Sequence, residues 1–176
     1  MKLNNIKQIK KYVIAFGSNL GDRLNNLSTS KSQLLENCPN PYKCIFSSVY
    51  ETSPVDCTES SGPFLNAVAE MDFDMNPEDV LKMCISIESN LGRPKKREKN
   101  SPRHIDLDIL YADNVIIEKN NLSIPHPRIL SRRFVLEPFA EIKPNLILPG
   151  QTKSIIEHLE NLKSKEPPLK MIFHKW

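Results

Sequence analysis

The chain contains 176 residues, of which 39% are hydrophobic and 26% are charged. This composition is ordinary for one globular domain and excludes the disordered and fibrous classes of protein. The net charge of +3 is local, because residues 93–103 hold six basic side chains and Glu98, whereas the rest of the chain has 18 basic and 20 acidic residues. Positive charge confined to one segment predicts a discrete anion site and no nucleic-acid partner.

The cysteines and the N-terminal residues indicate the compartment. No two of the four cysteines, Cys38, Cys44, Cys57 and Cys84, form a Cys-x-x-Cys pair, which favours free thiols in a reducing cytoplasm over structural zinc or disulfides. Residues 1–11 are polar and basic, and the apolar run that follows, 12–16, is too short for a signal peptide or a membrane span. We therefore predict a cytoplasmic protein without a membrane partner, with an N-terminal extension at 1–10 and one domain at 11–176.

Hydrophobic periodicity and turn residues predict the elements of the first half of the chain. We expect a strand at 12–16, a helix at 23–37, antiparallel strands at 43–51 and 64–71, and a helix at 77–91. Asn76 is expected to cap the second helix, with Pro77 as its first residue and Gly92 just beyond its end. The stretch between Pro54 and Gly62 is rich in turn-forming residues and predicts a mobile loop.

The second half continues the same alternation of strands and helices. We expect a strand at 104–111, a hairpin turn at Asp113-Asn114 into 115–117, an extended segment at 124–127, helices from Ser131 or Arg132 to Phe139 and at 154–162, and a strand at 169–173. Because the strands come in pairs with helices between the pairs, the pattern predicts an α+β domain with a largely antiparallel sheet.

The predicted strand at 104–111 carries the strongest chemical signal. Its period of two places His104, Asp106 and Asp108 on one face, and it places the apolar residues Ile105, Leu107 and Ile109 on the other. Two neighbouring carboxylates require a compensating positive charge, and the basic segment 93–103 precedes them directly. Mg²⁺ binds well to one or two carboxylates together with waters and phosphates. The pattern therefore predicts a polyanion site with metal on the acids, suited to in-line transfer assisted by two ions.

Other interpretations of these features stay open on the residues alone. An isolated Asp-x-Asp is usually a solvated strand face, and a basic run is usually a solvated charge cluster. A metal-assisted RNA- or phosphate-binding module, or a nucleotide-sugar site of the glycosyltransferase kind, would also use the two acids. The residues Gly17-Ser18-Asn19 are more typical of a simple turn than of a ligand-binding loop. Taken singly, His126, Phe64 and Phe134 are typical of structural residues. The glycine motifs of the common nucleotide-binding loops are missing.

Several blocks of the sequence together resemble one enzyme family. Pro102-Arg103-His104-Ile105-Asp106-Leu107-Asp108-Ile109-Leu110 resembles the signature of the 6-hydroxymethyl-7,8-dihydropterin pyrophosphokinase family. The other blocks that match, in family order, are Gly17-Ser18-Asn19-Leu20-Gly21, Tyr50-Glu51-Thr52-Ser53-Pro54, Phe64-Leu65-Asn66-Ala67-Val68, Ile87-Glu88 with Leu91-Gly92-Arg93, Pro125-His126-Pro127, and Arg132-Arg133-Phe134-Val135-Leu136. The resemblance covers roughly residues 11–149.

This resemblance implies a ferredoxin-like α+β fold and transfer of pyrophosphate from ATP to the pterin hydroxymethyl group, releasing AMP, by a monomer in folate biosynthesis. It implies that Asp106 and Asp108 hold two Mg²⁺ ions and that Arg93 and Arg103 act on the phosphates. The residues that it implies for the ATP site are Glu88, Lys95, Lys99, Arg103, Ile109, His126 and Arg132. For the pterin it implies stacking between Phe64 and Phe134, a hydrogen bond from Asn66 to the edge of the ring, and Thr52 and Ser53 nearby.

The chain departs from the family pattern in three places. Lys99-Asn100-Ser101 stands where many members have Arg-Trp-Gly, so an aromatic cover and one bidentate phosphate contact are lost. Phe64 stands where a Tyr is common and keeps the stacking face, whereas Pro127 replaces a Tyr, so no contact is carried over there. We expect the segments 54–62 and 93–103 to be lids that exclude water, with lid closure altered by these changes.

Overall fold

The computed structural model describes residues 8–53, 62–93, 101–164, 166 and 169–176. Its strands are β1 (Lys10–Ser18), β2 (Ile45–Phe46), β3 (Val49–Thr52), β4 (Phe64–Phe73), β5 (Asp106–Ala112), β6 (Ile117–Lys119), β7 (Leu122–Ile124) and β8 (Lys170–Phe173). Its α-helices are α1 (Arg23–Leu35), α2 (Pro77–Asn90), α3 (Arg133–Ile142) and α4 (Ile155–Glu160), with 3₁₀ turns η1 (Pro41–Lys43) and η2 (Ile129–Ser131). None of these helices has the length and apolar character needed to cross a bilayer.

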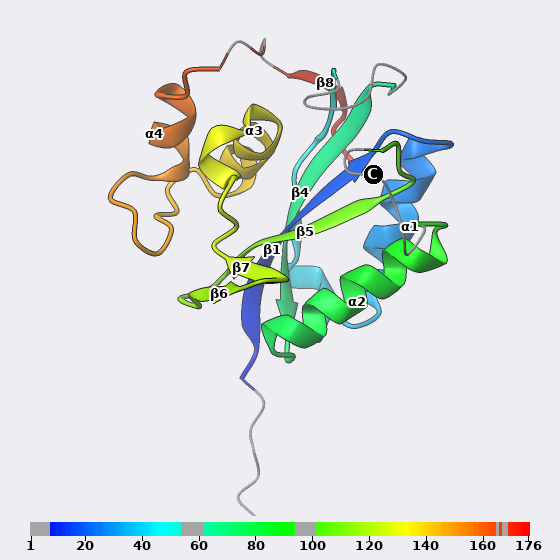
Figure 1. The fold of residues 1–176 in the computed structure, drawn as a ribbon, viewed down its shortest axis with the longest axis horizontal. Helices are drawn as coiled ribbons and strands as arrows, with labels where there is room; N and C mark the ends of the chain where they lie inside the picture. The colour runs from blue at the N-terminus through cyan, green and yellow to red at the C-terminus, as the bar shows by residue number, and fades with distance from the viewer. Residues whose placement is uncertain (1–7, 54–61, 94–100, 165, 167–168) are drawn as a thin grey trace, which may run out of the picture.

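One antiparallel sheet organises the domain (Figure 1). Its strand order is β5-β1-β4-β3-β8, and β2 also pairs with β4. Every pairing between its strands is antiparallel. The predicted α+β class with an antiparallel sheet is confirmed. β1 begins at Lys10, inside the segment that we predicted as an extension.

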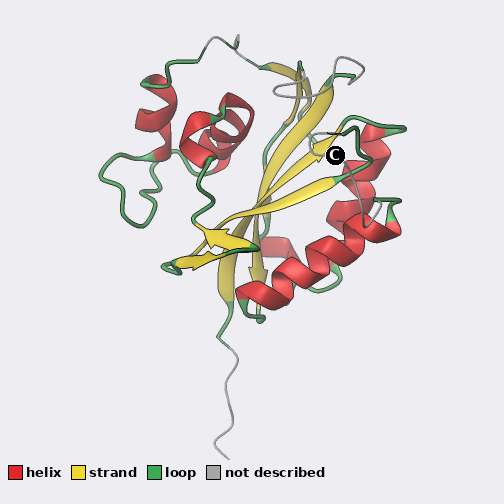
Figure 2. Cartoon of the chain, viewed as in Figure 1, coloured by secondary structure: helices red, strands yellow, loops and turns green. Residues whose placement is uncertain are grey.

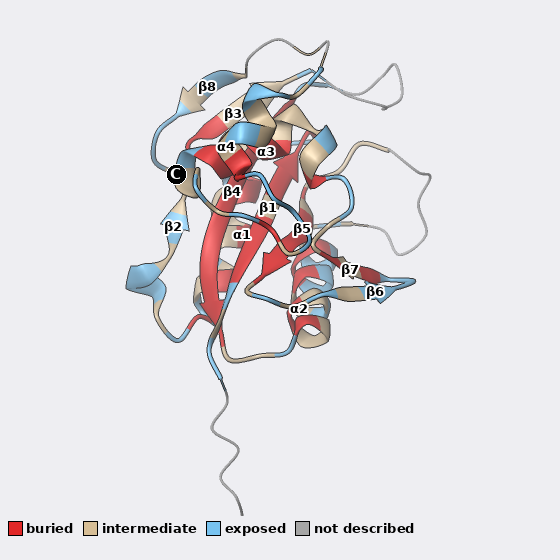
Figure 3. Ribbon diagram, turned by 90° about the vertical axis from the view of Figure 1, so that its left-hand side faces the viewer, coloured by how far each residue is buried: buried red, intermediate tan, exposed pale blue. Residues whose placement is uncertain are grey.

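The helices lie on both sides of this sheet (Figure 2). α1 and α2 cover one face, where Ile14, Phe16 and Leu107 join the larger hydrophobic core. α3 and α4 cover the other face, where Val13, Val68 and Leu110 form a second core, and Figure 3 shows the buried centre of β1 and β4 between them.

The ends of α2 follow the predicted capping chemistry, and α4 adds a cap that was not predicted. The Asn76 side chain accepts a hydrogen bond from the amide of Asp79, and Pro77 is the first residue of α2. Gly92 follows the helix with a φ of +92°, a backbone conformation that favours glycine. At α4, Ser154 and Glu157 form a reciprocal capping box. Local sequence therefore fixes where α2 and α4 begin.

The predicted hairpin between 104–111 and 115–117 is wrong. A turn does occur at Asp113, whose carboxylate accepts a hydrogen bond from the amide of Lys11, 3.0 Å away. β6 pairs with β7 in a separate two-stranded sheet and does not pair with β5. The amide of His126 donates to the carbonyl of Leu110 at 2.8 Å, so the chain after β7 lies along β5 where the hairpin partner was expected.

Two predicted strands are also shorter than expected. The strand at 43–51 is interrupted at Ser47 and Ser48, because the Ser47 hydroxyl accepts the amide of Val68 and the amide of Ser48 donates to the Glu141 carboxylate. The strand at 104–111 begins only at Asp106. His104 instead packs against Gly21 and Gly92, where an added Cβ would lie 3.2 Å and 3.4 Å from its ring, so His104 does not join the aspartates on the strand face.

Candidate active site

Strand register brings three sequence-distant residues into one row on the second face of the sheet. Gly17 of β1 lies opposite Asn66 of β4 on one side and opposite Asp106 of β5 on the other. A Cβ added at Gly17 would lie 3.4 Å from the Asn66 Oδ1 atom and 3.9 Å from the Asp106 Cβ. Glycine therefore keeps the floor of the site low between the amide and the carboxylate.

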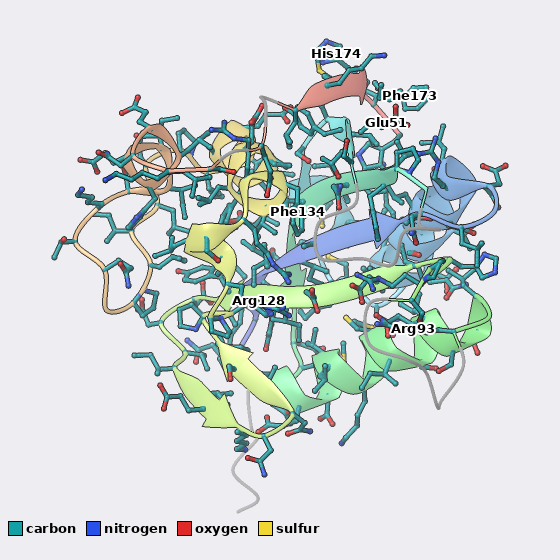
Figure 4. The ribbon with its side chains drawn as sticks, turned by 45° about the horizontal axis from the view of Figure 1, so that its top comes forward. Glu51, Arg93, Arg128, Phe134, Phe173 and His174 are labelled. Atoms are coloured by element: carbon teal, nitrogen blue, oxygen red, sulfur yellow. The ribbon has the colours of Figure 1, made fainter. Side chains whose placement is uncertain are left out.

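Asp106 is held by two arginines from two different segments. One of its oxygens is 2.7 Å from Nη2 of Arg93, and the other is 2.9 Å from Nη2 of Arg103. Arg93 follows α2 (Figure 4), whereas Arg103 precedes β5. Charged hydrogen bonds of this length are strong and also fix the orientation of the groups that they join. The two guanidinium groups are therefore aligned beside the carboxylate face of β5.

Asp108 lies two residues further along the same face, opposite Ala15 of β1. It has no ion pair within 4.0 Å among the residues that the structure describes. Burial first, and the charge of Asp106 second, raise the pKa of Asp108 to about 6. The positive charge near Asp108 is too small to offset its burial beside a second carboxylate. A bound cation would therefore stabilise the ionised form of Asp108.

The donor set fits Mg²⁺ better than a metal that needs an all-protein cage. Within the described ranges, no group of three or more His, Cys, Asp or Glu side chains is placed to hold a metal ion. Asp106 and Asp108 supply two hard carboxylate donors on one strand face. Mg²⁺ characteristically takes one or two carboxylates and completes its shell with waters and substrate phosphates. The residues present therefore fit the predicted metal.

Glu88 contacts other residues of the protein at the end of α2. It is 7% exposed, accepts the amide of Leu107 at 2.8 Å and forms an ion pair with Arg93. Burial raises the pKa of Glu88 to about 7, against the opposing effects of the Leu107 amide and Arg93. Glu88 thus ties the end of α2 to β5 and orients Arg93 toward Asp106. Its predicted contact with nucleotide stays a prediction.

The residues predicted for a flat ring partly assemble beside this row. Asn66 donates to the Thr52 hydroxyl at 2.8 Å, and Phe64 lies two residues from Asn66 on the same strand. The Arg103 guanidinium lies 5.3 Å from the Phe64 ring centroid. Ser53 follows β3 and is exposed. Arg103 therefore connects the aromatic end of the site with the carboxylate end.

Phe134 enters from the opposite helical layer. It lies in the first turn of α3, and Figure 4 shows it across β5 from Arg93 in that view. The Arg132 guanidinium lies 5.2 Å from its ring centroid. This pair repeats the arrangement of Arg103 over Phe64, so each aromatic ring in the predicted sandwich has an arginine beside it. Stacking of a ligand between the two rings stays a prediction.

His126 and Arg132 lie where the charges of neighbouring arginines outweigh those of Asp106 and Asp108. Burial, followed by the charges of Arg132 and Arg128, lowers the pKa of His126 to about 4, so its ring is neutral at pH 7. Burial, followed by Arg128, also lowers the pKa of Arg132. Arg128 is exposed and was missed by sequence reasoning, although it follows directly on the Pro-His-Pro block. Clustered cations of this kind favour an anionic ligand.

The structure does not place the remaining residues predicted to bind the nucleotide, Ile109, Lys95 and Lys99, beside the aspartates. The Ile109 side chain is 4% exposed and belongs to the core under α1 and α2, on the face opposite to the aspartates. Lys95 and Lys99 lie outside the described residues, as does most of each predicted lid. Their predicted roles in binding ATP stay predictions.

Asn19 is a further residue that the sequence did not single out for function. Its amide donates to the Arg103 carbonyl at 3.1 Å, and its side-chain oxygen accepts the Arg103 amide at 2.8 Å. The Asn19 Nδ2 and Arg103 Nε atoms are buried and have no hydrogen-bond partner in the described part of the chain. The only earlier signal was the Gly-Ser-Asn turn after β1. Asn19 therefore fixes the backbone of Arg103 and leaves donors available beside it.

Paired carboxylates, aligned arginines suited to phosphate and aromatic rings beside an amide are typical of one class of protein, the phosphotransferases. Residues 13–144 match the family model described as 7,8-dihydro-6-hydroxymethylpterin-pyrophosphokinase (HPPK). The chain therefore belongs to the HPPK family.

Individual relatives agree with this membership. The chain is 40% identical over 136 residues to "Folic acid synthesis protein FOL1" of Dictyostelium discoideum, a match that spans 77% of this chain and 20% of that protein. It is 40% identical over 129 residues to the 2-amino-4-hydroxy-6-hydroxymethyldihydropteridine pyrophosphokinase of Bacillus subtilis, covering 73% of this chain and 75% of that one. The chain thus spans about a fifth of the FOL1 protein but most of the bacterial enzyme.

A solved structure supports the fold independently. The wild-type HPPK-DHPS of Plasmodium falciparum with pteroate superposes with a TM-score of 0.67 at 16% identity, over 88% of this chain and 42% of that one. At this identity the likeness concerns the fold alone. It agrees with the open antiparallel sheet and the helical layers described above.

Proposed function

We propose that this protein transfers pyrophosphate from ATP to the hydroxymethyl group of 6-hydroxymethyl-7,8-dihydropterin, releasing AMP, as a step of folate biosynthesis. The observation that carries the proposal is the row formed by Asn66, Gly17 and Asp106, which joins a ring-binding end to a phosphate-binding end on one sheet face. Family membership supports the same reaction.

The reaction requires one bond to form and one to break at the β-phosphorus. The hydroxymethyl oxygen attacks that phosphorus, the bond to the oxygen bridging the α- and β-phosphates breaks, AMP leaves with that oxygen, and the hydroxyl proton passes to solvent. Arg93 and Arg103 are oriented by Asp106 and can stabilise charge on the phosphate oxygens as it redistributes. Two Mg²⁺ ions on Asp106 and Asp108 would neutralise the polyphosphate and align its oxygens.

Recognition of the acceptor depends on the aromatic end of the row. A pterin is flat and polar at its edge, so it needs a stacking surface and a few hydrogen-bonding groups. Phe64 offers a ring at the floor of the site, and the Asn66 amide is already oriented by Thr52. Phe134 would complete the stack from α3. These residues would place the hydroxymethyl group next to the carboxylate end.

The ATP end would use the positive cluster in the segment between β7 and α3. Arg132, with Arg128 nearby, would bind phosphate oxygens, and neutral His126 can donate or accept one hydrogen bond without adding charge. Lys95, Lys99 and Glu88 are proposed at the same end. We also propose that the protein acts as a monomer, as the family resemblance implies. We propose a cytoplasmic location without nucleic-acid or membrane partners, because the excess positive charge is confined to one segment and the cysteines show no disulfide framework.

The direct test is to follow AMP formation by the purified protein with ATP and Mg²⁺, with and without the hydroxymethyl-dihydropterin. We expect AMP only when the pterin is present. ADP as the nucleotide product, or AMP formation independent of the pterin, would contradict the proposal.

Phe64→Leu is expected to raise the KM for the pterin about tenfold and to leave the KM for ATP within about twofold. Leucine keeps the apolar volume but removes the ring, and stacking on an aromatic ring contributes about 1–3 kcal/mol per base. Steady-state kinetics with each substrate varied in turn measures the effect. Phe46→Leu is a matched control, because Phe46 packs against Trp176 and lies outside the row. Equal loss of affinity for both substrates in Phe64→Leu would refute the assignment.

Asn19→Ala is expected to lower kcat about fivefold, since Arg103 loses a hydrogen bond worth about 1 kcal/mol that fixes its backbone. Asn19→Asp keeps the acceptor for the Arg103 amide but adds negative charge near the phosphates. That variant should therefore retain most of kcat while raising the KM for ATP. If both variants lowered kcat equally, or neither changed it, Asn19 would have no positioning role.

A further inference from the structure

Two of the cysteines come together after the end of α1, although they form no Cys-x-x-Cys pair in the sequence. The Sγ atoms of Cys38 and Cys44 are 3.3 Å apart. We propose that Cys38 and Cys44 form a redox-modifiable site, at which a small-molecule disulfide converts the two thiols into an intramolecular disulfide. This inference is independent of the proposed enzymatic reaction.

The surrounding backbone holds both cysteines in place. The amide of Cys38 donates to the Leu35 carbonyl at 3.1 Å, and the amide of Cys44 donates to the Pro41 carbonyl at 3.3 Å. Asn40, between them, donates to the Asp72 carboxylate of β4 at 3.2 Å. The segment 38–44 is therefore tied at each end and in the middle. The short distance between the sulfurs reflects a fixed loop geometry, and only a small side-chain movement is needed to form a bond.

The two thiols differ in a way that suits exchange chemistry. Cys38 is 7% exposed, whereas Cys44 is half-buried and accessible to a small reagent. The Cys44 thiolate attacks one sulfur of the reagent RSSR, forming a mixed disulfide and releasing RS⁻. The Cys38 thiolate then attacks the Cys44 sulfur and releases the second RS⁻. In total the protein loses two protons and two electrons, and RSSR is reduced to two RSH.

The environment of Cys44 affects both directions of this exchange. Burial, followed by the hydrogen bond with Cys38, raises the pKa of Cys44 to about 12, and the other charged group facing it is Asp72. Little thiolate is present at neutral pH, so the first step is slow. A thiol with a high pKa is also a poor leaving group, so the disulfide resists reduction once formed.

Cys84 provides an internal control. It lies on the buried face of α2, burial raises its pKa to about 12, and no other cysteine contacts it among the described residues. Cys57 lies outside the described residues, so the experiment is best done in a Cys57→Ser background. The background protein then contains one adjacent pair and one isolated buried thiol.

The test is incubation of this folded protein with oxidised glutathione, followed by alkylation in denaturant and peptide mass spectrometry. We expect a peptide linked through Cys38 and Cys44, with Cys84 fully alkylated, and recovery of both thiols with a strong dithiol reductant. Adding Cys38→Ser removes the resolving thiol, so Cys44 should instead accumulate the mixed glutathione disulfide. Two results for the protein that retains both Cys38 and Cys44 would overturn the proposal. One is a mixed glutathione disulfide that persists on Cys44, and the other is that both thiols remain free, whatever the Cys38→Ser variant does.

Discussion

Asp108→Asn is expected to lower kcat about a thousandfold while leaving the melting temperature equal to or above that of the wild type. The loss of rate follows from removing one of two carboxylates proposed to hold the cations that stabilise transition-state charge. The retained stability follows from the position of Asp108, which is half-buried next to Asp106 and has no ion pair in the described part of the chain. Removing its charge therefore relieves repulsion in the folded protein.

Asp106→Asn is the matched variant, because it changes the same chemical group two residues away. It should lose a similar amount of activity but also be less stable by about 1–3 kcal/mol, since Arg93 and Arg103 lose their carboxylate partner. Calorimetry and AMP release measured on both variants separate the two effects. Near wild-type turnover in Asp108→Asn would rule out its metal role, and equal melting temperatures would show that the ion pairs of Asp106 contribute nothing.

Arg103→Lys is expected to lower kcat/KM about a hundredfold. Arg103 contacts Asp106, lies over the Phe64 ring and is fixed by Asn19, and a lysine ammonium cannot reproduce that planar geometry. Because Arg103 connects both ends of the site, the KM values for ATP and for the pterin should both rise. Steady-state kinetics measures these values.

Arg133→Lys serves as the control for this substitution. Arg133 also has one carboxylate partner, Glu137 at 3.3 Å, and also has a buried Nε atom without a partner in the described residues. Its ion pair lies within α3, so its kinetics should stay within about twofold of the wild type. If the two variants behaved alike, the special role of Arg103 would be refuted.

The sequence predicted the carboxylate strand correctly because the signal is local. Alternation of acids with Leu107 and Ile109 requires no knowledge of distant residues, and β5 shows this alternation with the apolar residues buried. The cap at Asn76 and the turn at Asp113 were predicted for the same reason. Nearest-neighbour chemistry is enough to define such features.

The arrangement of the site could not be read in the same way. The row of Asn66, Gly17 and Asp106 depends on the register of three strands that are far apart in the chain. The hairpin prediction was wrong for a related reason. The turn is local, but β6 pairs with β7, and the chain near His126 bonds to β5 instead, which the local sequence does not indicate. The roles of Asn19 and Cys44 likewise arise from contacts that only the folded chain creates.

In the proposed reaction the pterin hydroxyl attacks the β-phosphorus of ATP, and this attack can be measured. It is tested most directly with ATP that carries oxygen-18 in the bridge between the α- and β-phosphates, followed by mass spectrometry of both products. We predict AMP that retains the label and a pterin that has gained an unlabelled pyrophosphate, in equal amounts. Label in the pterin product, or a pterin carrying a single phosphate, would contradict the proposed reaction.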